Sequence, residues 1–492
     1  MRPLLFVRPS VVQAPSRRAR LVALVTLVTL GVCGAIGAAG CSTAATTTAA
    51  AAPVVAPDGS DAGSTVDDPA SDASTSELAC TEGVASGFAK KATPFTLPAS
   101  RCGQAFDRLS ATGDLVYTLL DVNADRRPDL VVTSDACDEE IGTKRWDVYL
   151  ASASGFAKTP TSLTLPVSRC GKDFDAVSGN GDLVYTLLDV NADRRPDLVV
   201  TSDACDAEIG DKRWDAYVAS DAGFAKTPTP FTLPASRCNA PFDGVSGSGS
   251  VRYTLLDVDA DRRPDLVVTA DTCDAEVGMA RWDVYVASDA GFAKTPTPFA
   301  LPAPRCNAPF DRVAGAGSVR YTLLDVDADR RPDLVVTADT CDEDLGAKRW
   351  DVYRASSAGF AKAPSAFSLP ASRCGEPFNA VGGAGNVRYA LLDLSCDGRG
   401  DLVVTGDSCD EDIGAKRWDI YVASSAGFSK TPSPLTLPAA RCGERFDAFG
   451  KSGKVPYTIL DMSADSRVDL LVTSDSCDEA VGTSRWDAYA LE

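Results

Sequence analysis

Oxygen-bearing side chains alternate along one short stretch of the chain, between two apolar runs. Asp121, Asn123, Asp125 and Asp129 occupy positions one, three, five and nine of a segment within LLDVNADRRPDLVVTS. Side chains at these positions of a tight hairpin can converge on one point, where a backbone carbonyl and water complete the shell. Ca²⁺ takes about six to eight oxygen ligands in flexible geometry, so this spacing predicts a calcium-binding loop. Position twelve is Val132, which excludes an EF-hand with its bidentate Glu.

The same acidic segment occurs six times along the chain. Position three is Asn in two copies, Asp in two and Ser in two, and positions one, five and nine are always Asp. The predicted Ca²⁺ ligands of the other copies are Asp189, Asn191, Asp193, Asp197, Asp257, Asp259, Asp261, Asp265, Asp325, Asp327, Asp329, Asp333, Asp393, Ser395, Asp397, Asp401, Asp461, Ser463, Asp465 and Asp469.

The unit that contains this segment repeats every 68 residues, as the dipeptide GF marks. GF begins, without insertion or deletion between copies, at Gly87, Gly155, Gly223, Gly291, Gly359 and Gly427. Within a copy, VYTLLDV, DLVVTS, RWDVYLAS and SLTLP have the composition of short strands, and clusters of Asp, Gly, Pro and Ser separate them. Four short strands per copy are typical of a β-propeller blade. A β-solenoid and separate β-sandwich domains are the alternatives.

The two ends of the repeat array are permuted. The segment from Gly87 to Pro98 matches the fourth strand of a unit, whereas the last copy ends after its third strand. A closed ring would let Phe95 to Pro98 pair beside Arg485 to Leu491 and would remove two exposed sheet edges. We therefore predict an all-β fold, a six-bladed β-propeller of four-stranded blades at residues 80–492, closed by the N-terminal strand.

The frame GF…LLDVNADRRPDLVV…WDVYLAS…GF resembles the FG-GAP and VCBS repeats found in integrin α-chain propellers and related bacterial surface proteins. The resemblance covers about residues 87–492, in all six copies. In that family a loop D-x-[DN]-x-D-G-x-x-D-L joins the first two strands of a blade and holds Ca²⁺, which implies the ligands named above. Family position six is usually Gly. In this chain it is, from the first copy to the last, Arg126, Arg194, Arg262, Arg330, Gly398 and Ser466.

These arginines leave a second interpretation of the loops open. A left-handed residue other than Gly costs ~1–2 kcal/mol, and Arg126 with Arg127 could neutralise the carboxylates without any metal. The loop would then be a self-neutralised acidic turn. Copy five, which keeps Gly398, is predicted to be the strongest Ca²⁺ site.

Twelve of the sixteen Cys follow a regular pattern, two per copy and 35 residues apart. Successive turns of an antiparallel blade alternate between its faces, so both Cys of a copy lie on one face, opposite the acidic segment. A disulfide framework is the default in an exported chain; zinc is the alternative, but the chain has no His and no CxxC spacing. Cys80 and Cys396 fall outside the pattern and are predicted to pair with each other, with two free thiols as the alternative. The predicted repeat pairs are Cys102–Cys137, Cys170–Cys205, Cys238–Cys273, Cys306–Cys341, Cys374–Cys409 and Cys442–Cys477.

The N-terminal region has the pattern of an export signal. Residues 1–40 contain five Arg and no acidic residue, and an apolar stretch ends in AAGC. This resembles a bacterial lipobox, which implies cleavage before Cys41 and lipidation of its sulfur; an uncleaved anchor and an ordinary signal are the alternatives. Residues 41–79 are rich in Ala, Thr, Ser and Asp and predict a flexible tether. The expected location is the outer membrane or the cell surface, with the lipid as the contact to the membrane.

Composition limits the functions that remain. A formal net charge of −20 disfavours nucleic acid, and the absence of His excludes His-based triads. Because Asp recurs equally in every copy, no single asymmetric catalytic site is apparent, and we predict no enzyme. The favoured function is a monomeric, multivalent module that binds protein or glycan. A structural envelope scaffold without a discrete ligand is the alternative, and a carboxylate-based hydrolase is the least favoured.

Six Trp occupy one equivalent position in each copy. Aromatic side chains dominate core burial, so packing at the start of the third strand is the favoured interpretation. A ring of sugar-stacking sites is the alternative. The six are Trp146, Trp214, Trp282, Trp350, Trp418 and Trp486.

Overall fold

The computed structural model describes residues 85–492, which are all-β. The predicted signal (1–40), the tether (41–79) and Cys80 lie outside the described residues. No helix in the described part of the chain could cross a membrane.

The first complete copy forms a four-stranded antiparallel sheet. Strand β2 (Leu115–Leu120) pairs with β3 (Asp129–Asp135), β3 pairs with β4 (Arg145–Tyr149), and β4 pairs with β7 (Thr161–Thr164). These are the four strands that the composition predicts, in sequence order across the sheet.

The other copies repeat this order. Copy two has β8 (Leu183–Leu188), β9 (Asp197–Asp203), β10 (Arg213–Tyr217) and β11 (Thr229–Thr232). Copy three has β12 (Ser246–Ser248), β13 (Val251–Leu256), β14 (Asp265–Asp271), β15 (Arg281–Tyr285) and β18 (Thr297–Ala300). Copy four has β19 (Gly315–Ala316), β20 (Val319–Leu324), β21 (Asp333–Asp339), β22 (Arg349–Tyr353) and β25 (Ser365–Ser368). Copy five has β26 (Gly383–Ala384), β27 (Val387–Leu392), β28 (Asp401–Asp407), β29 (Arg417–Tyr421) and β32 (Ser433–Thr436). Copy six has β33 (Tyr457–Leu460), β34 (Asp469–Val472) and β35 (Arg485–Tyr489).

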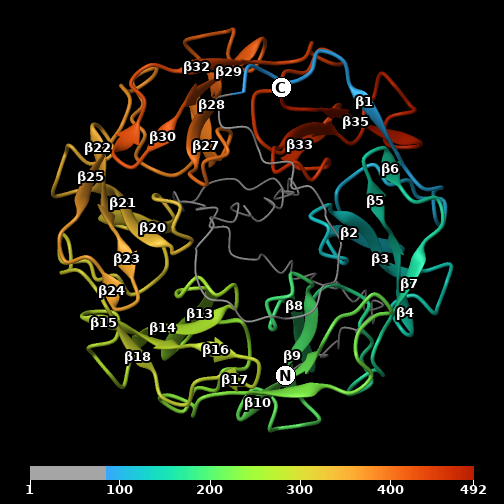
Figure 1. Cartoon of the computed structure of the whole chain (residues 1–492), viewed down its shortest axis with the longest axis vertical. Coiled ribbons are helices and arrows are strands. Elements are labelled where there is room, and N and C mark those ends of the chain that lie inside the picture. The colour runs from blue at the N-terminus through green and yellow to red at the C-terminus, as the bar shows by residue number, and fades with distance from the viewer. Residues whose placement is uncertain (1–84) are drawn as a thin grey trace, which may run out of the picture.

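The sheets are set around a common centre, in a β-propeller-like arrangement (Figure 1). The inner strands, which lie nearest the middle, are β2, β8, β13, β20, β27 and β33, and the later strands of each copy lie towards the rim. Strand β1 (Thr93–Thr96) pairs antiparallel with β35, the third strand of copy six, and places Phe95 opposite Trp486. The first and last strands of the described chain therefore belong to one sheet.

The hydrophobic core lies between neighbouring sheets. Strand β3 is buried on both faces, because its side chains alternate between them. Leu130 and Val132 pack in one cluster with Trp486 of copy six, whereas Val131 packs in another with Trp146. Each copy thus buries apolar surface against both neighbours, as repeat architectures require.

The GF dipeptides form short hairpins that reach the neighbouring sheet. In copy one, β5 (Ala151–Ser152) turns into β6 (Gly155–Phe156), and Gly155 pairs in parallel with Thr96 of β1. The prediction that the fourth strand begins at GF is therefore wrong. A polar turn separates the dipeptide from the fourth strand of its own copy, and the hairpin extends the outer edge of the sheet before it. Equivalent hairpins are β16 (Ala287–Ser288) with β17 (Gly291–Phe292), β23 (Ala355–Ser356) with β24 (Gly359–Phe360), and β30 (Ala423–Ser424) with β31 (Gly427–Phe428).

Replacing Gly155 by Ala is expected to destabilise the fold by about 2–5 kcal/mol. A Cβ at Gly155 would lie 2.0 Å from the Thr96 hydroxyl oxygen and 2.4 Å from its backbone nitrogen, and φ is +139°. The matched control is Gly103→Ala, which also has a positive φ but has no atom within 4 Å of the new Cβ. Urea unfolding measures both variants. Equal losses in the two would contradict the close approach of the hairpin.

Candidate metal-binding loops

In every copy an acidic loop connects the inner strand to the strand that follows it in the sequence. Acidic loops 1 to 6 span residues 121–129, 189–197, 257–265, 325–333, 393–401 and 461–469. Each loop begins where the inner strand ends and finishes on the first residue of the next strand, so the sheet fixes both of its ends.

Side chains of acidic loop 1 hold its own backbone in place. Asp121 Oδ2 accepts a hydrogen bond from the Arg126 N–H at 2.8 Å, and Asp125 Oδ1 accepts one from the Arg127 N–H at 2.8 Å. Asn123 Oδ1 accepts the Asp125 N–H at 3.0 Å. These contacts draw the predicted ligands towards the inside of the turn.

Two residues of the loop adopt the left-handed conformation. Arg126, at position six, has φ +70°, and Ala124, at position four, has φ +62°. The sequence analysis predicts a left-handed residue at position six only. In acidic loop 5 the same positions are Cys396 with φ +61° and Gly398 with φ +79°, so this loop avoids the left-handed cost at position six.

Asp129, at position nine, is fully buried and ties the loop to the neighbouring hairpin. Its Oδ1 accepts the Ala151 N–H at 2.7 Å, and its Oδ2 accepts the Val122 N–H at 3.2 Å. Burial, together with the charges of Asp125 and Asp121, raises the pKa of Asp129 to about 7. Burial likewise raises the pKa of the equivalent carboxyls, to about 6 at Asp197 and Asp401 and to about 7 at Asp265, Asp333 and Asp469.

Arginine side chains pair with only part of the loop. In four copies the Arg at position seven lies near the Asp at position five, whereas in copy two Arg195 pairs with Asp221 at 2.6 Å. No ion pair within residues 85–492 reaches the Asp at position one or nine. Self-neutralisation by these ion pairs therefore covers position five and leaves the two other carboxylates. The position-seven pairs are Arg127–Asp125 at 3.9 Å, Arg263–Asp261 at 3.2 Å, Arg331–Asp329 at 3.9 Å and Arg399–Asp397 at 2.9 Å.

Several oxygen atoms in the loops are buried without a hydrogen-bond partner among the described residues. They include Oδ1 of Asp121 and the hydroxyl of Ser395. Buried polar atoms are normally paired, and an all-oxygen donor set suits a hard cation such as Ca²⁺. The residues of the acidic loops therefore fit the ion that the sequence predicts.

Acidic loops of adjacent copies touch each other. Arg127 Nη2 in loop 1 donates to the backbone carbonyl of Ser463 in loop 6 at 3.0 Å. Arg399 Nη2 in loop 5 donates to the carbonyl of Asp327 in loop 4 at 3.4 Å. Loop 1 is therefore in contact with loop 6, and loop 5 with loop 4.

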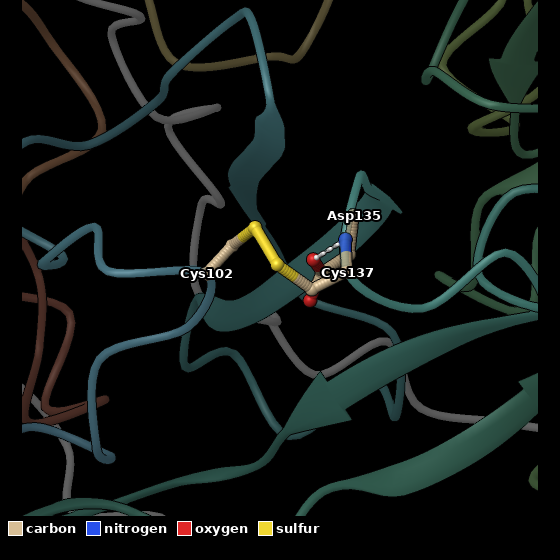
Figure 2. A group of neighbouring side chains, drawn as sticks. All are labelled: Cys102, Asp135 and Cys137. Atoms are coloured by element: carbon tan, nitrogen blue, oxygen red, sulfur yellow. Dashed lines mark hydrogen bonds between the residues drawn. A yellow bond between two sulfur atoms is a disulfide. The ribbon is translucent and has the colours of Figure 1, made fainter.

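The repeat Cys form disulfides, as the sequence predicts. Figure 2 shows the Cys102–Cys137 bridge beside Asp135, whose Oδ1 accepts the Cys137 N–H at 2.8 Å. Each Cys–Asp–Cys group resembles a metal site in its spacing, but oxidised sulfurs offer no thiolate to a metal. The six bridges indicate an oxidising, extracytoplasmic environment. The other five are Cys170–Cys205, Cys238–Cys273, Cys306–Cys341, Cys374–Cys409 and Cys442–Cys477.

Cys396, in acidic loop 5, is also disulfide-bonded. Cys80, its predicted partner, lies outside the described residues, so the pairing of these two stays a prediction.

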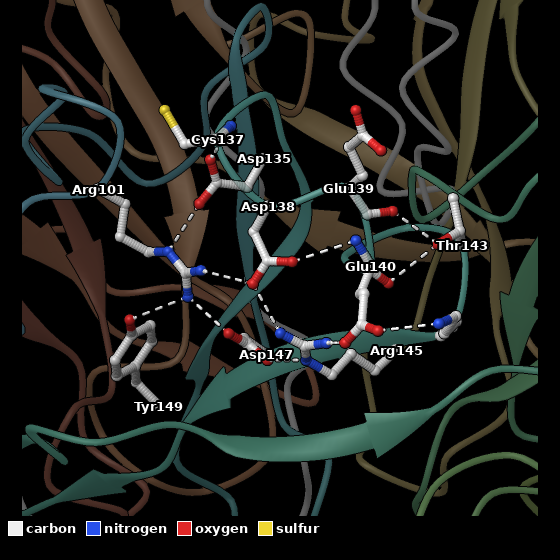
Figure 3. A network of polar contacts seen from close by, with 11 residues as sticks. Arg101, Asp135, Cys137, Asp138, Glu139, Glu140, Thr143, Arg145, Asp147 and Tyr149 are labelled. Carbon is white, nitrogen blue, oxygen red and sulfur yellow. Dashed lines mark hydrogen bonds and ion pairs between the residues drawn. The ribbon is translucent and has the colours of Figure 1, made fainter.

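A half-buried arginine joins the turns opposite the acidic loops. In copy one, Arg101 pairs with Asp135 at 2.8 Å and with Asp147 at 2.6 Å, and it donates to the Tyr149 hydroxyl at 3.3 Å (Figure 3). Arg145 reaches Asp147 from the other side at 3.0 Å. Sequence reasoning missed this network, although an Arg before the first Cys of every copy was a visible signal. The equivalents of Arg101 are Arg169, Arg237, Arg305, Arg373 and Arg441.

Replacing Arg101 by Met is expected to lower the free energy of unfolding by about 3–5 kcal/mol, because Asp135 and Asp147 would lose a charged partner while buried. The control is Arg108→Met, since the Arg108 side chain is 65% exposed and its pairing contributes ~0–1 kcal/mol. Urea unfolding at pH 7 distinguishes the two. A loss no larger in Arg101→Met than in the control would contradict a structural role for the network.

The six Trp are buried in the core, which confirms packing and excludes sugar stacking at these side chains. Trp146 Nε1 donates to the Phe174 carbonyl of the next copy at 2.7 Å. The same contact links the last copy to the first, where Trp486 Nε1 donates to the Phe106 carbonyl at 2.8 Å.

No family model and no curated protein matches the chain. Among solved structures, an Agrocybe aegerita lectin described as recognising non-reducing terminal N-acetylglucosamine aligns with 80% of this chain and 86% of its own, at 14% identity and a TM-score of 0.42. The TcdB2–TccC3 structure aligns with 82% of this chain and only 16% of its own, at 14% identity and a TM-score of 0.30. An α-L-arabinofuranosidase from Fusarium graminearum aligns with 82% of this chain and 98% of its own, at 9% identity and a TM-score of 0.31. These likenesses are too distant to assign a function.

Proposed function

We propose that residues 80–492 form a closed six-bladed β-propeller that carries Ca²⁺ in its acidic loops and binds a protein or glycan ligand multivalently outside the cytoplasm. The observation that carries this proposal is the set of acidic loops itself. The loops repeat in every copy and keep carboxylates at positions one and nine without an ion-pair partner among residues 85–492. Two neighbouring pairs of loops are also in contact, loops 1 and 6 and loops 4 and 5.

Ca²⁺ would be held by the side-chain oxygens at positions one, three, five and nine. When bound, the ion supplies positive charge that offsets the repulsion between the carboxylates. Asp129 already joins the loop to the hairpin at Ala151, so an ordered loop also orders the edge of the neighbouring sheet. The result would be a rigid, repeated surface.

A repeated surface favours multivalent binding, because identical weak sites add through effective concentration. A structural envelope scaffold is the second candidate. The observation that favours it is that the two best-formed hollows in residues 85–492 are small. The larger of these two has a volume of about 20 Å³ and is lined by residues that include Gly315 and Tyr321. A carboxylate-based hydrolase remains the least favoured, since it needs a cleft and one distinctive pair of acids.

Attachment to the membrane would come from a lipid on Cys41. Labelled fatty acid should then attach to the chain, and Cys41→Ser should release it from the membrane fraction. Labelling that survives this substitution would contradict the lipid anchor, but it would leave the proposed propeller unaffected.

The ligand proposal is tested with a glycan array and with capture on immobilised envelope proteins, using the full chain in Ca²⁺ and in chelator. Binding that depends on Ca²⁺ and weakens when single loops are disabled supports a multivalent module. No binding to either surface, with Ca²⁺ still bound, would favour the scaffold.

A further inference from the structure

Two of the acidic loops are identical in sequence but have different neighbours. The chain from Tyr253 to Asp274 is repeated letter for letter from Tyr321 to Asp342. Acidic loops 3 and 4 lie within these stretches, so any difference between the two must come from residues packed around them. The chain therefore supplies its own internal control.

The decisive neighbour is the residue just before the short hairpin of each copy. It is Arg354 in copy four, whereas the equivalent position in the other copies is apolar: Leu150, Val218, Val286, Val422 and Ala490. A second difference is Ser357 in copy four against Asp289 in copy three, and Asp289 pairs with Arg263 of loop 3 at 2.8 Å.

Arg354 reaches into acidic loop 4. Its Nη1 forms an ion pair with Oδ2 of Asp327, the predicted ligand at position three. Its Nη2 donates to the carbonyl of Ser425, in the hairpin of the next copy, at 3.2 Å. The guanidinium is thus anchored from both sides.

The hydrogen bonds of Asp327 differ from those of its equivalent in loop 3, Asp259. In loop 3, Oδ1 of Asp259 accepts the Asp261 N–H at 3.2 Å, which keeps the carboxylate inside the turn. In loop 4, Oδ1 of Asp327 is buried and has no hydrogen-bond partner among the described residues, while Oδ2 is occupied by Arg354. The aspartate at position three therefore has different contacts in the two loops, although their sequences are identical.

We propose that Arg354 is a built-in counter-ion that replaces Ca²⁺ at acidic loop 4, so that this loop stays metal-free while loop 3 binds the ion. The inference rests on the proposed function of the loops. Oδ2 of Asp327 cannot serve the guanidinium and a metal ion at once, and a fixed positive charge beside the loop repels a second cation. Loop 4 would be rigid without Ca²⁺, and the loops would divide into metal-dependent and metal-independent ones.

Reciprocal variants of the full chain test this, with equilibrium dialysis to count bound Ca²⁺ per chain. Arg354→Val should add one ion, and Val286→Arg should remove one. Arg312→Val makes the same chemical change at an exposed side chain and should leave the count unchanged. Melting in chelator gives a second readout: Val286→Arg should melt higher than the wild type, and Arg354→Val lower.

Unchanged counts in both variants, with Ca²⁺ bound to the wild type, would overturn the inference and leave the proposed function standing. If Arg354→Val does not fold, the count in Val286→Arg decides alone. A wild-type chain that binds no Ca²⁺ would contradict the proposed function itself.

Discussion

Deleting residues 85–98 is expected to lower the melting temperature more than any single core substitution. This segment contributes Phe88 and Phe95, each no more than 3% exposed, to the clusters between copies. Phe95 lies 6.4 Å from Trp486 and 4.9 Å from Phe156, measured between ring centroids. Removing one buried Phe costs ~3–5 kcal/mol, so the two together account for roughly 6–10 kcal/mol before the lost strand pairing.

The last residues of the chain lie beside this N-terminal segment, so a smaller deletion can test the same contacts. Residues at the two ends assemble the hairpin that is continuous elsewhere: Ala89 N–H donates to Ala490 at 2.8 Å, and Glu492 N–H donates to Gly87 at 2.8 Å. Removing 490–492 should therefore reproduce part of the loss. Thr93→Ala, at an exposed position of β1, is the control that should melt like the wild type. An unchanged melting curve after the full deletion would contradict closure by the N-terminal strand.

Calcium is expected to give the second large effect, and the effect should depend on pH. In chelator the folded chain carries carboxyls such as Asp129 with a pKa of about 7, against ~3.9 in an unfolded chain. Between about pH 4 and pH 7 the folded state therefore binds more protons than the unfolded state. Stability without Ca²⁺ should fall as the pH rises through this window.

Added Ca²⁺ should reverse this trend, because it binds the ionised carboxylates. Each site contributes ~2.7 kcal/mol when free Ca²⁺ is about 100 times its Kd. Melting scans with and without chelator at pH 5 and pH 7.5 measure the difference, which should be larger at pH 7.5. Asp393→Asn should remove the site of copy five, while Asp211→Asn, at an exposed turn residue outside the acidic loops, serves as the control. If chelator changes nothing at either pH, the arginine-neutralised interpretation of the loops is correct.

Sequence alone predicted the repeat, the strands and the repeat disulfides, because these depend on local or periodic patterns. Short runs rich in Leu, Val and Thr mark strands such as β3, and a constant 35-residue spacing marks each Cys pair. The acidic loops were equally visible, since their predicted ligands lie within nine consecutive residues.

Only the tertiary structure decided which distant residues come into contact, within a copy and between copies. Gly155 belongs to the edge of the preceding sheet, Trp146 to the interface with the next copy, and Arg101 to a network of residues 34 and 46 positions away. Arg354 is the sharpest case. No local sequence pattern distinguishes Arg354 from its equivalent in copy three, Val286. The role proposed for Arg354 depends on Asp327, which lies 27 residues earlier and comes into contact with it only when the sheet has formed. Contacts of this kind depend on distance in space, which the order of residues along the chain does not specify.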